Sequence, residues 1–347
     1  MTRSQGRIPR PQAHRPVPAS IATIEAGVRG GAGNSLLENT KAPTATWRWC
    51  PPLNLVADTE MIEVKTLRSW GELHRYREYG RHRWLFRGQR DAAWDLKTSI
   101  ERCLDREQIP AASRQERERG LMREFRRAYH QYAAHVPPND YFVEWLALMQ
   151  HHGAPTRLLN FTYSIYVAAY FATEDTEGDC AVWAINGSWA FQQTYLLLKA
   201  ANKPINSMKT LLPYQFDEGR EKDTKELFFE SPVSSLVCPI NPYRLNERLR
   251  TQKGIFLMQG DLTSGFMANL TNMRGFDKRR NAIKLVIPKL LRREFLKSLF
   301  EMNINRTSLF PGLDGFARSL GVYSPAYHAA PWLEETASGV KICPKQG

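Results

Sequence analysis

Arg87 and Gly88 stand side by side at the end of the short apolar run Trp84-Leu85-Phe86. A guanidinium group offers a planar fork of donors that suits a phosphate or a carboxylate. Because glycine has no side chain, a ligand or another stretch of backbone can come close at position 88. The pair therefore predicts a place where an anion binds. The residues leave open a second interpretation, in which Arg87 forms a structural ion pair with Asp91 or Asp95.

A second group of polar residues lies between a predicted helix and a predicted strand, in the segment Gln150-His151-His152-Gly153-Ala154-Pro155-Thr156-Arg157-Leu158-Leu159-Asn160-Phe161-Thr162. Loops held by rigid elements commonly carry functional residues, and histidine suits proton transfer near neutral pH. Adjacent histidines point apart, so at most one of them is expected to face a site. The alternative is that one histidine caps the preceding helix. A metal site is not indicated, because no two histidines lie one helical turn apart.

Three further basic segments have simpler interpretations. Gln252 and Gly254 precede an apolar strand in segment 248–256, where we expect a surface turn. Lys278-Arg279-Arg280 is a candidate phosphate-contacting loop. Segment 114–127 holds many arginines, but the glutamates between them predict ion pairs within one helix and a solvated face. Its arginines are Arg114, Arg117, Arg119, Arg123, Arg126 and Arg127.

The elements that must position these residues are short strands mixed with helices. Apolar residues three or four apart predict helices at 70–79, 114–135, 141–150, 165–174 and 289–301. Apolar runs bounded by turn residues predict strands at 84–87, 156–159, 181–185, 235–238, 254–258 and 283–287. No repeat of about 20–50 residues is present. The pattern predicts a single compact α+β unit over residues 61–325.

The ends of the chain differ from this unit. Residues 1–60 are rich in proline and glycine, so we expect a disordered tail, and Met61 is a candidate start of translation. Residues 326–347 are expected to form a C-terminal tail. The N-terminus lacks the apolar run of a secretory signal, and no segment reaches the roughly 18 apolar residues of a membrane helix. We therefore expect a cytoplasmic protein without a membrane partner.

Charge and motifs narrow the function classes. The formal net charge of +13 favours polyanionic partners such as nucleic acid, nucleotides or phosphorylated cofactors, although a generally basic solvated surface is the alternative. The five cysteines form no C-x-x-C pair, so a zinc site or a disulfide framework is not indicated. The sequence has no P-loop, no strand-linked Gly-x-Gly-x-x-Gly and no Gly-x-Ser-x-Gly elbow. These absences exclude P-loop ATPases, Rossmann dehydrogenases and α/β-hydrolases.

Two motifs together resemble the FRG-domain family, which is named for its Phe/Tyr-Arg-Gly sequence. They are Phe86-Arg87-Gly88-Gln89 and the long segment from Trp145 to Leu159, with core motifs between residues 81 and 186. Segments 252–254 and 309–315 are similar to later parts of the family. Where the family typically has Asp-Trp, this chain has Asn160-Phe161. The resemblance implies an FRG domain over residues 61–325 and a bacterial or phage toxin or defence function, with an antitoxin or defence-system partner.

A more distant resemblance is to ADP-ribosyltransferases, which implies NAD as cofactor and a split sheet. Their Arg-Gly on a first strand resembles Arg87-Gly88, and their Ser-Thr-Ser stretch before an Ala-rich helix resembles residues 160–172. By this resemblance, Arg87 would hold the diphosphate or ribose and Gly88 would admit the nicotinamide. Hydroxyl groups would brace the pocket as an oxocarbenium-like charge develops.

The third ADP-ribosyltransferase motif, Glu-x-Glu or Gln-x-Glu, is incomplete, because Gly254 replaces its last glutamate. Three alternatives stay open: another acid such as Glu226 or Glu230 substitutes, Gln252 orients the ribose without charge, or the protein has no transferase activity. The catalytic residues that the resemblance implies are Arg87, His152, Arg157 and Gln252. The residues that it implies for contact with NAD are Arg87, Gly88, Gln89, Thr156, Asn160, Thr162 and Ser164.

Two competing hypotheses belong to other functional classes. One is a nucleic-acid-binding or metal-independent RNA-cleaving module, in which His151, His152 and Arg157 act on the phosphate. The other is a non-catalytic domain that binds a protein target. All enzymatic hypotheses require that Arg87 and the turn from His152 to Arg157 line a common cleft.

Overall fold

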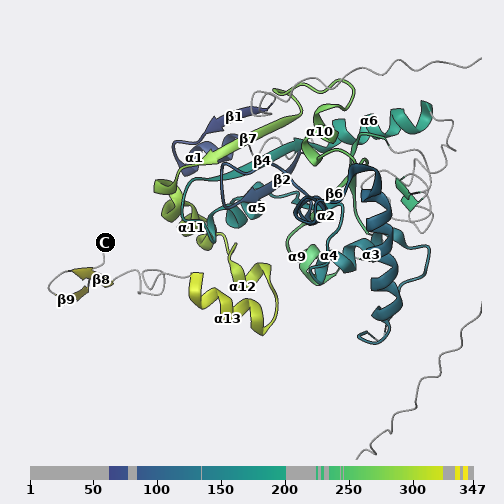
Figure 1. Ribbon diagram of the computed structural model, residues 1–347. Helices are drawn as coiled ribbons and strands as arrows, with labels where there is room; N and C mark the ends of the chain where they lie inside the picture. Colours follow the sequence, from purple (N-terminus) through teal and green to yellow (C-terminus); the bar gives the residue numbers. More distant parts are fainter. Residues whose placement is uncertain are drawn as a thin grey trace, which may run out of the picture. The chain divides into compact units, whose positions relative to one another are not determined.

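Seven strands form one mixed sheet in the order β1-β7-β4-β2-β3-β6-β5 (Figure 1). The computed structural model describes residues 62–76, 84–133, 135–200, 224–225, 228–229, 234–242, 244, 246–322, 333–336 and 339–342. The strands are β1 (Glu63–Thr66), β2 (Trp84–Gln89), β3 (Leu158–Thr162), β4 (Cys180–Asn186), β5 (Val237–Ile240), β6 (Gly254–Gln259) and β7 (Ala282–Ile287). Strand β1 runs parallel to β7, and the other neighbours pair antiparallel. A separate hairpin joins β8 (Leu333–Thr336) to β9 (Gly339–Ile342).

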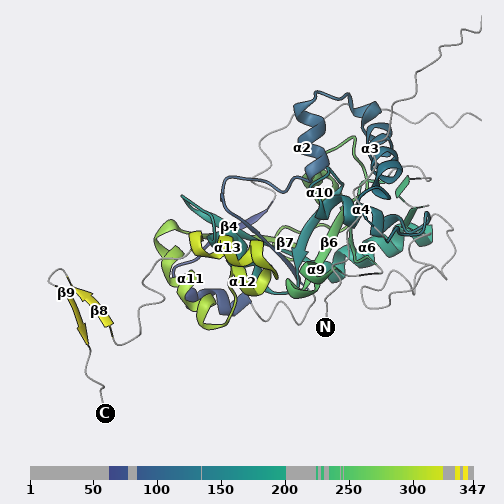
Figure 2. The ribbon, with the colours of Figure 1, turned by 90° about the horizontal axis from the view of Figure 1, so that it is seen from below.

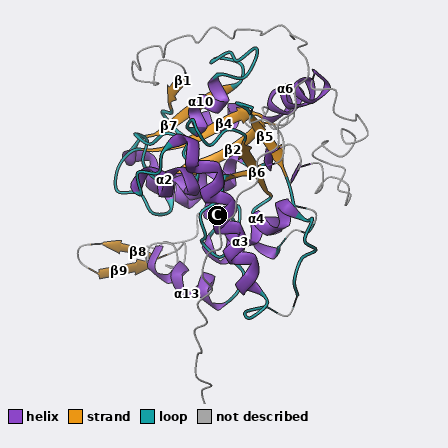
Figure 3. Cartoon of the chain, turned by 45° about the vertical axis from the view of Figure 1, so that its right-hand side comes forward, coloured by secondary structure: helices purple, strands orange, loops and turns teal. Residues whose placement is uncertain are grey.

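Helices pack against both faces of the sheet (Figure 3). The helices are α1 (Trp70–Leu73), α2 (Ser99–Arg106), α3 (Arg114–Tyr129), α4 (Phe142–His151), α5 (Ile165–Thr173), α6 (Gly187–Ala200), α9 (Glu247–Thr251), α10 (Phe266–Thr271), α11 (Arg292–Glu301), α12 (Arg306–Leu309) and α13 (Leu313–Val322). Helix α11 packs against α5 and α1, and α12 packs against α9 and α13. Helices α11, α12 and α13 lie toward the viewer in the view from below (Figure 2). None of the helices in the described ranges is long and apolar enough to cross a membrane.

The core follows from the alternation of side chains along each strand. In β4, Val182 and Ala184 point into a cluster with α5 and α11, whereas Trp183 and Ile185 point into a cluster with α10. Both sets are fully buried, and this explains why the strand is apolar at every position from Cys180 to Ile185. A third cluster lies where α3 and α4 pack on β3, β5 and β6.

The α+β class predicted from the sequence is confirmed, and several elements match closely. Helix α5 and strand β4 lie within one residue of their predicted bounds, as does helix α4. Strands β5, β6 and β7 lie within two residues of theirs. The predicted tail over residues 1–60 lies outside the described residues, and so does most of the predicted C-terminal tail.

Other predictions need correction. The helix predicted to reach residue 135 ends at Tyr129, and Tyr132 beyond its end is 82% exposed. The strand predicted at 156–159 begins at Leu158. The side chains of Thr156 and Arg157 before it bond Gln150 and Glu118 of two helices. The strand predicted at 84–87 continues through Gln89 as β2. The expected surface turn in segment 248–256 contains helix α9, and α2, α6 and α10 were not predicted.

The sheet opens between β2 and β3. Strand β2 pairs with β4 at every position from Trp84 to Gln89, but it pairs with β3 only at Phe86, opposite Thr162. Strand β3 in turn pairs with β6 along its whole length. The two halves of the sheet therefore separate beyond a single shared position, and we call this opening the fork.

Gly88 is required on the covered side of β2. A side chain there would meet the backbone of α5, with a Cβ atom 2.0 Å from the carbonyl oxygen of Ala168 and 2.5 Å from the amide nitrogen of Ala172. The small residues of α5 allow this approach from the other side. Of the two roles open for Gly88, close approach of another backbone is the one observed.

Replacing Gly88 by alanine is expected to lower the free energy of unfolding by about 1–3 kcal/mol, because α5 must move away from the sheet. Gly120→Ala is the matched control: it lies in α3 with open space around it, so the same change is expected to stabilise the protein by up to about 1 kcal/mol. Urea unfolding followed by circular dichroism measures both. Equal effects of the two substitutions would contradict the packing role.

Candidate functional site

A cleft of about 860 Å³ opens at the fork. Its walls come from β2 and the loop after it, from the end of β3, and from Phe171, Arg248 and Gln252. The volume lies within the range of about 300–1,000 Å³ that is typical of small-molecule sites. The opening in the sheet therefore gives space for a ligand of nucleotide size.

Arg87 reaches across the fork. Its Nη1 donates to the carbonyl oxygen of Asn160 on β3 at 2.8 Å. Its Nε is buried and has no hydrogen-bond partner among the described residues. Burial lowers the pKa of Arg87 to about 10, and repulsion from Arg102 adds to this effect. The alternative of an ion pair with Asp91 or Asp95 is not observed in the described chain, so this cation lacks a counter-charge.

Other cationic side chains line the same cleft. They are Arg90, Lys97, Arg102 and Arg248, whereas the carboxylates in the lining are Asp95 and Asp175. Asp175 pairs with Arg90 at 3.2 Å between the side chains. Burial lowers the pKa of Arg248, and the nearby Arg306 lowers it further. The excess of positive charge favours an anionic ligand.

Trp94 supplies an aromatic surface in the cleft. Its side chain is 45% exposed, and the guanidinium of Arg90 lies 5.3 Å from its ring centre. A hydrogen bond fixes its backbone: Nζ of the buried Lys284 donates to the Trp94 carbonyl at 3.0 Å. An exposed tryptophan beside cations is a surface on which a flat ring can stack. Trp94 was missed in the sequence, where its only signal is a large aromatic between small and acidic residues.

Six of the predicted site residues come together at the cleft: Arg87, Gly88, Gln89, Asn160, Thr162 and Gln252. The amide of Gln89 is already engaged, since it accepts from Trp183 Nε1 at 2.7 Å and donates to the Asp95 carbonyl at 3.1 Å. Thr162 donates to the Gln252 carbonyl at 2.8 Å and so fixes the backbone of that residue. The Gln252 side chain donates to the Leu309 carbonyl at 3.1 Å.

Four predicted residues do not line the cleft. Ser164 caps α5 by accepting from the amide of Val167 at 3.4 Å. Thr156 is buried and donates to the side chain of Gln150. His152 is exposed after α4, with its ring 4.9 Å from that of His151. The prediction that Arg87 and the turn from His152 to Arg157 line a common cleft is wrong, because the cleft joins Arg87 to residues 160–162 and no residue of that turn lines it. An enzymatic function would therefore have to rest on the residues of the cleft without the turn.

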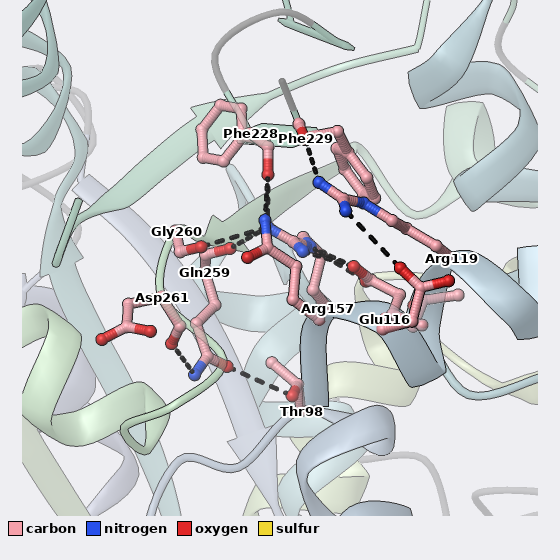
Figure 4. Close-up of polar contacts among 12 residues, drawn as sticks. Thr98, Glu116, Arg119, Arg157, Phe228, Phe229, Gln259, Gly260 and Asp261 are labelled. Atoms are coloured by element: carbon pink, nitrogen blue, oxygen red, sulfur yellow. Dashed lines mark hydrogen bonds and ion pairs between the residues drawn. The ribbon is translucent and has the colours of Figure 1, made fainter. Parts of the chain in front are cut away.

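Arg157, the fourth of these residues, is fully buried in the interior. Its Nε donates to Glu118 of α3 at 2.9 Å, and Nη2 bonds the same carboxylate. Its Nη1 donates to the carbonyls of Phe228 and Gly260 at 3.3 Å and 3.1 Å (Figure 4). The guanidinium also lies 4.3 Å from the ring centre of Phe229. With every side filled, Arg157 has no surface to present to a substrate and instead ties β3 to α3.

The acids named as substitutes for the missing glutamate, Glu226 and Glu230, lie outside the described residues. Within the described ranges, Asp95 is the carboxylate of the cleft lining that has no ion pair. No group of three histidine, cysteine or acidic residues in those ranges could hold a metal ion.

Comparison with known proteins gives one match. Residues 82–180 match the family model of the FRG domain, and this supports the FRG family for that segment. The segment runs from the start of β2 to the first residue of β4 and carries most of the cleft. No curated protein and no solved structure matches the chain.

Because removal of one member of a buried pair leaves an uncompensated charge, Arg157→Ala is expected to lower the free energy of unfolding by about 3–5 kcal/mol. Arg127→Ala removes an exposed pair with Glu124 and is expected to cost less than about 1 kcal/mol. Thermal and urea unfolding of both variants provide the measurement. A stable Arg157→Ala protein would show that the interior pair is dispensable.

Proposed function

We propose that the cleft binds a phosphate-bearing nucleotide, with NAD as the first candidate, and that the protein is an ADP-ribosyltransferase-like toxin or defence effector. The observation that carries this proposal is the state of Arg87, a partly exposed side chain whose buried Nε has no acceptor and whose charge has no counter-charge among the described residues. A phosphate would supply both the missing acceptor and the missing charge.

Different residues of the cleft would contact different parts of the proposed ligand. Arg87 and Arg102 hold phosphate, and the exposed ring of Trp94 stacks on a base. Asn160 and Gln252 present amide groups for the ribose hydroxyls. Gly88 faces the backbone of α5, so it contributes to the proposed site by allowing β2 and α5 to meet, rather than by admitting the nicotinamide.

Bound NAD would supply an ADP-ribosyl group, whose bond to nicotinamide breaks as a bond to a nucleophile of the target forms. The chain must then stabilise positive charge on the ribose and take the proton of the nucleophile. Asp95 is suited to both tasks, because its carboxylate is exposed in the cleft and has no ion pair in the described chain. Asp95 is thus a further candidate for the role of the catalytic glutamate that Gly254 replaces.

The hypothesis of RNA cleavage by His151, His152 and Arg157 has less support. Arg157 is sealed in the interior, and neither histidine lies in the cleft. Three groups that do not share an accessible site cannot act together on one phosphate.

In a binding test, wild-type protein is expected to bind NAD and ADP but not nicotinamide alone, by isothermal titration calorimetry. Arg87→Ala is expected to weaken binding by about 1.5–3 kcal/mol, because its charged hydrogen bonds to phosphate are removed. Trp94→Ala is expected to weaken it by about 1–3 kcal/mol, because the base no longer stacks. Arg279→Ala, an exposed arginine outside the cleft, is the control. Equal affinities of all four proteins would remove the cleft as the nucleotide site.

Asp95→Asn tests the chemical step separately from binding. Because the hydrogen bond to Gln89 uses the backbone of Asp95, the substitution leaves the fold intact and is expected to preserve NAD affinity. Release of nicotinamide, measured by chromatography with a cell lysate as acceptor, is expected to fall about 10²–10⁴-fold, the usual contribution of a catalytic acid or base.

The same two cleft variants separate an enzyme from a non-catalytic interaction domain. Expression of a toxin in a bacterial host is expected to arrest growth, and Asp95→Asn is expected to relieve the arrest. Full arrest by both Arg87→Ala and Asp95→Asn, with the proteins folded, would favour an interaction domain.

A further inference from the structure

Helix α3 borders a second groove, of about 810 Å³, which shares no lining residue with the cleft. The α3 residues that line it are Arg119, Met122, Arg123, Arg126 and Arg127. Asn139, Phe142, Lys225 and Phe229 complete the lining, and no carboxylate belongs to its described part. We call Arg119, Arg123, Arg126 and Arg127 the arginine row.

The arginine row lies on the side of α3 next to the one that is fixed in the interior. Glu118 bonds Arg157, and Met122 packs in the cluster with α4 and β6. Residues spaced by three or four positions share one side of a helix, with Cβ atoms about 5–6 Å apart. The row therefore forms a line of guanidinium groups along the groove.

Two members of the arginine row have no carboxylate partner in the described chain. Arg126 is held by Asn139, with Nη2 donating to Oδ1 at 2.6 Å and to the carbonyl at 3.0 Å, and its guanidinium lies 5.3 Å from the ring centre of Trp145. Arg123 is exposed, with no ion pair or hydrogen bond among the described residues. The sequence-based expectation of a face neutralised by ion pairs within the helix is therefore met only in part.

The other two members form exposed pairs, Arg119 with Glu116 at 3.5 Å and Arg127 with Glu124 at 3.1 Å. Arg119 also donates from Nη2 to the carbonyl oxygen of Phe229. Exposed pairs of this kind are weak and are screened by salt. These ion pairs can be exchanged for a stronger anion at small cost. Arg123 and Arg127 are therefore open to a partner, whereas Arg119 and Arg126 are also bonded to oxygen atoms of Phe229 and Asn139.

We propose that the arginine row binds the phosphate backbone of a nucleic acid strand. Guanidinium groups spaced along a helix can each contact one of the successive phosphates of a nucleic acid strand. A single small anion would instead be bound by side chains that converge on one point. The apolar floor offers no surface for stacking, because Met122, Phe142 and Phe229 are buried. Binding would therefore depend on the backbone and not on base sequence. The net charge of +13 supports such a polyanionic partner.

The test uses the full chain and a fluorescein-labelled RNA oligonucleotide in fluorescence anisotropy titrations at several salt concentrations. Arg123→Glu with Arg127→Glu reverses two exposed members of the row and leaves Arg126 packed on Trp145. We expect affinity to fall at least tenfold. We also expect a shallower dependence of log K on log salt, by about 0.7–0.9 for each phosphate that the protein no longer neutralises. Affinity for NAD, measured in parallel, is expected to be unchanged.

Arg250→Glu with Arg279→Glu is the matched control, because both are exposed arginines outside the groove and the charge change is the same. A loss of affinity of less than threefold is expected in this control. Equal losses of affinity in the two double variants would show diffuse attraction to a basic surface and overturn the proposal. Equal competition by polyglutamate and by unlabelled RNA would also overturn it, in favour of an acidic protein partner.

Discussion

The buried ion pair between Arg157 and Glu118 fixes two surfaces of the protein at once. Both side chains are out of contact with water, so a shift of either element would leave an unpaired charge in the interior. On one side, the pair anchors the residues that enter β3, whose far end forms a wall of the cleft. On the other side, it sets the rotation of α3 and turns the arginine row toward solvent. The two basic surfaces thus share one internal anchor.

The cleft itself depends on the early separation of β2 from β3. The side chain of Arg87 spans the opening and bonds the Asn160 carbonyl, but the fold leaves its Nε dry and unpartnered. Because folding lowers the pKa of Arg87 to about 10, the charged side chain destabilises the folded state below that pH, and the cost falls as pH rises through it. A bound anion would reverse this cost. The uncompensated charge of Arg87 therefore favours binding of a phosphate group, whichever nucleotide carries that group.

Local sequence patterns predicted the elements whose identity depends on apolar spacing, such as α5 and β4. They could not predict partners remote in sequence. Arg157 and Asn160 belong to one polar segment, and from the sequence alone both could contact a ligand. Glu118, 39 positions before Arg157, pairs with Arg157 and fixes it in the interior. Trp94 was not singled out in the sequence, since a tryptophan is normally expected in the core. Only the course of the loop after β2 leaves it exposed in the cleft.

The order of strands in the sheet has a consequence for synthesis of the protein on the ribosome. Central strand β4 pairs on one side with β2, made earlier, but on the other with β7, whose Ile287 lies 107 positions after Cys180. Strand β3 likewise cannot pair with β6 until β6 has been synthesised. The nascent chain therefore carries two unpaired apolar strand edges while the intervening segment is translated, and such edges attract other chains. A chaperone that covers them during elongation would protect this protein more than one acting after release.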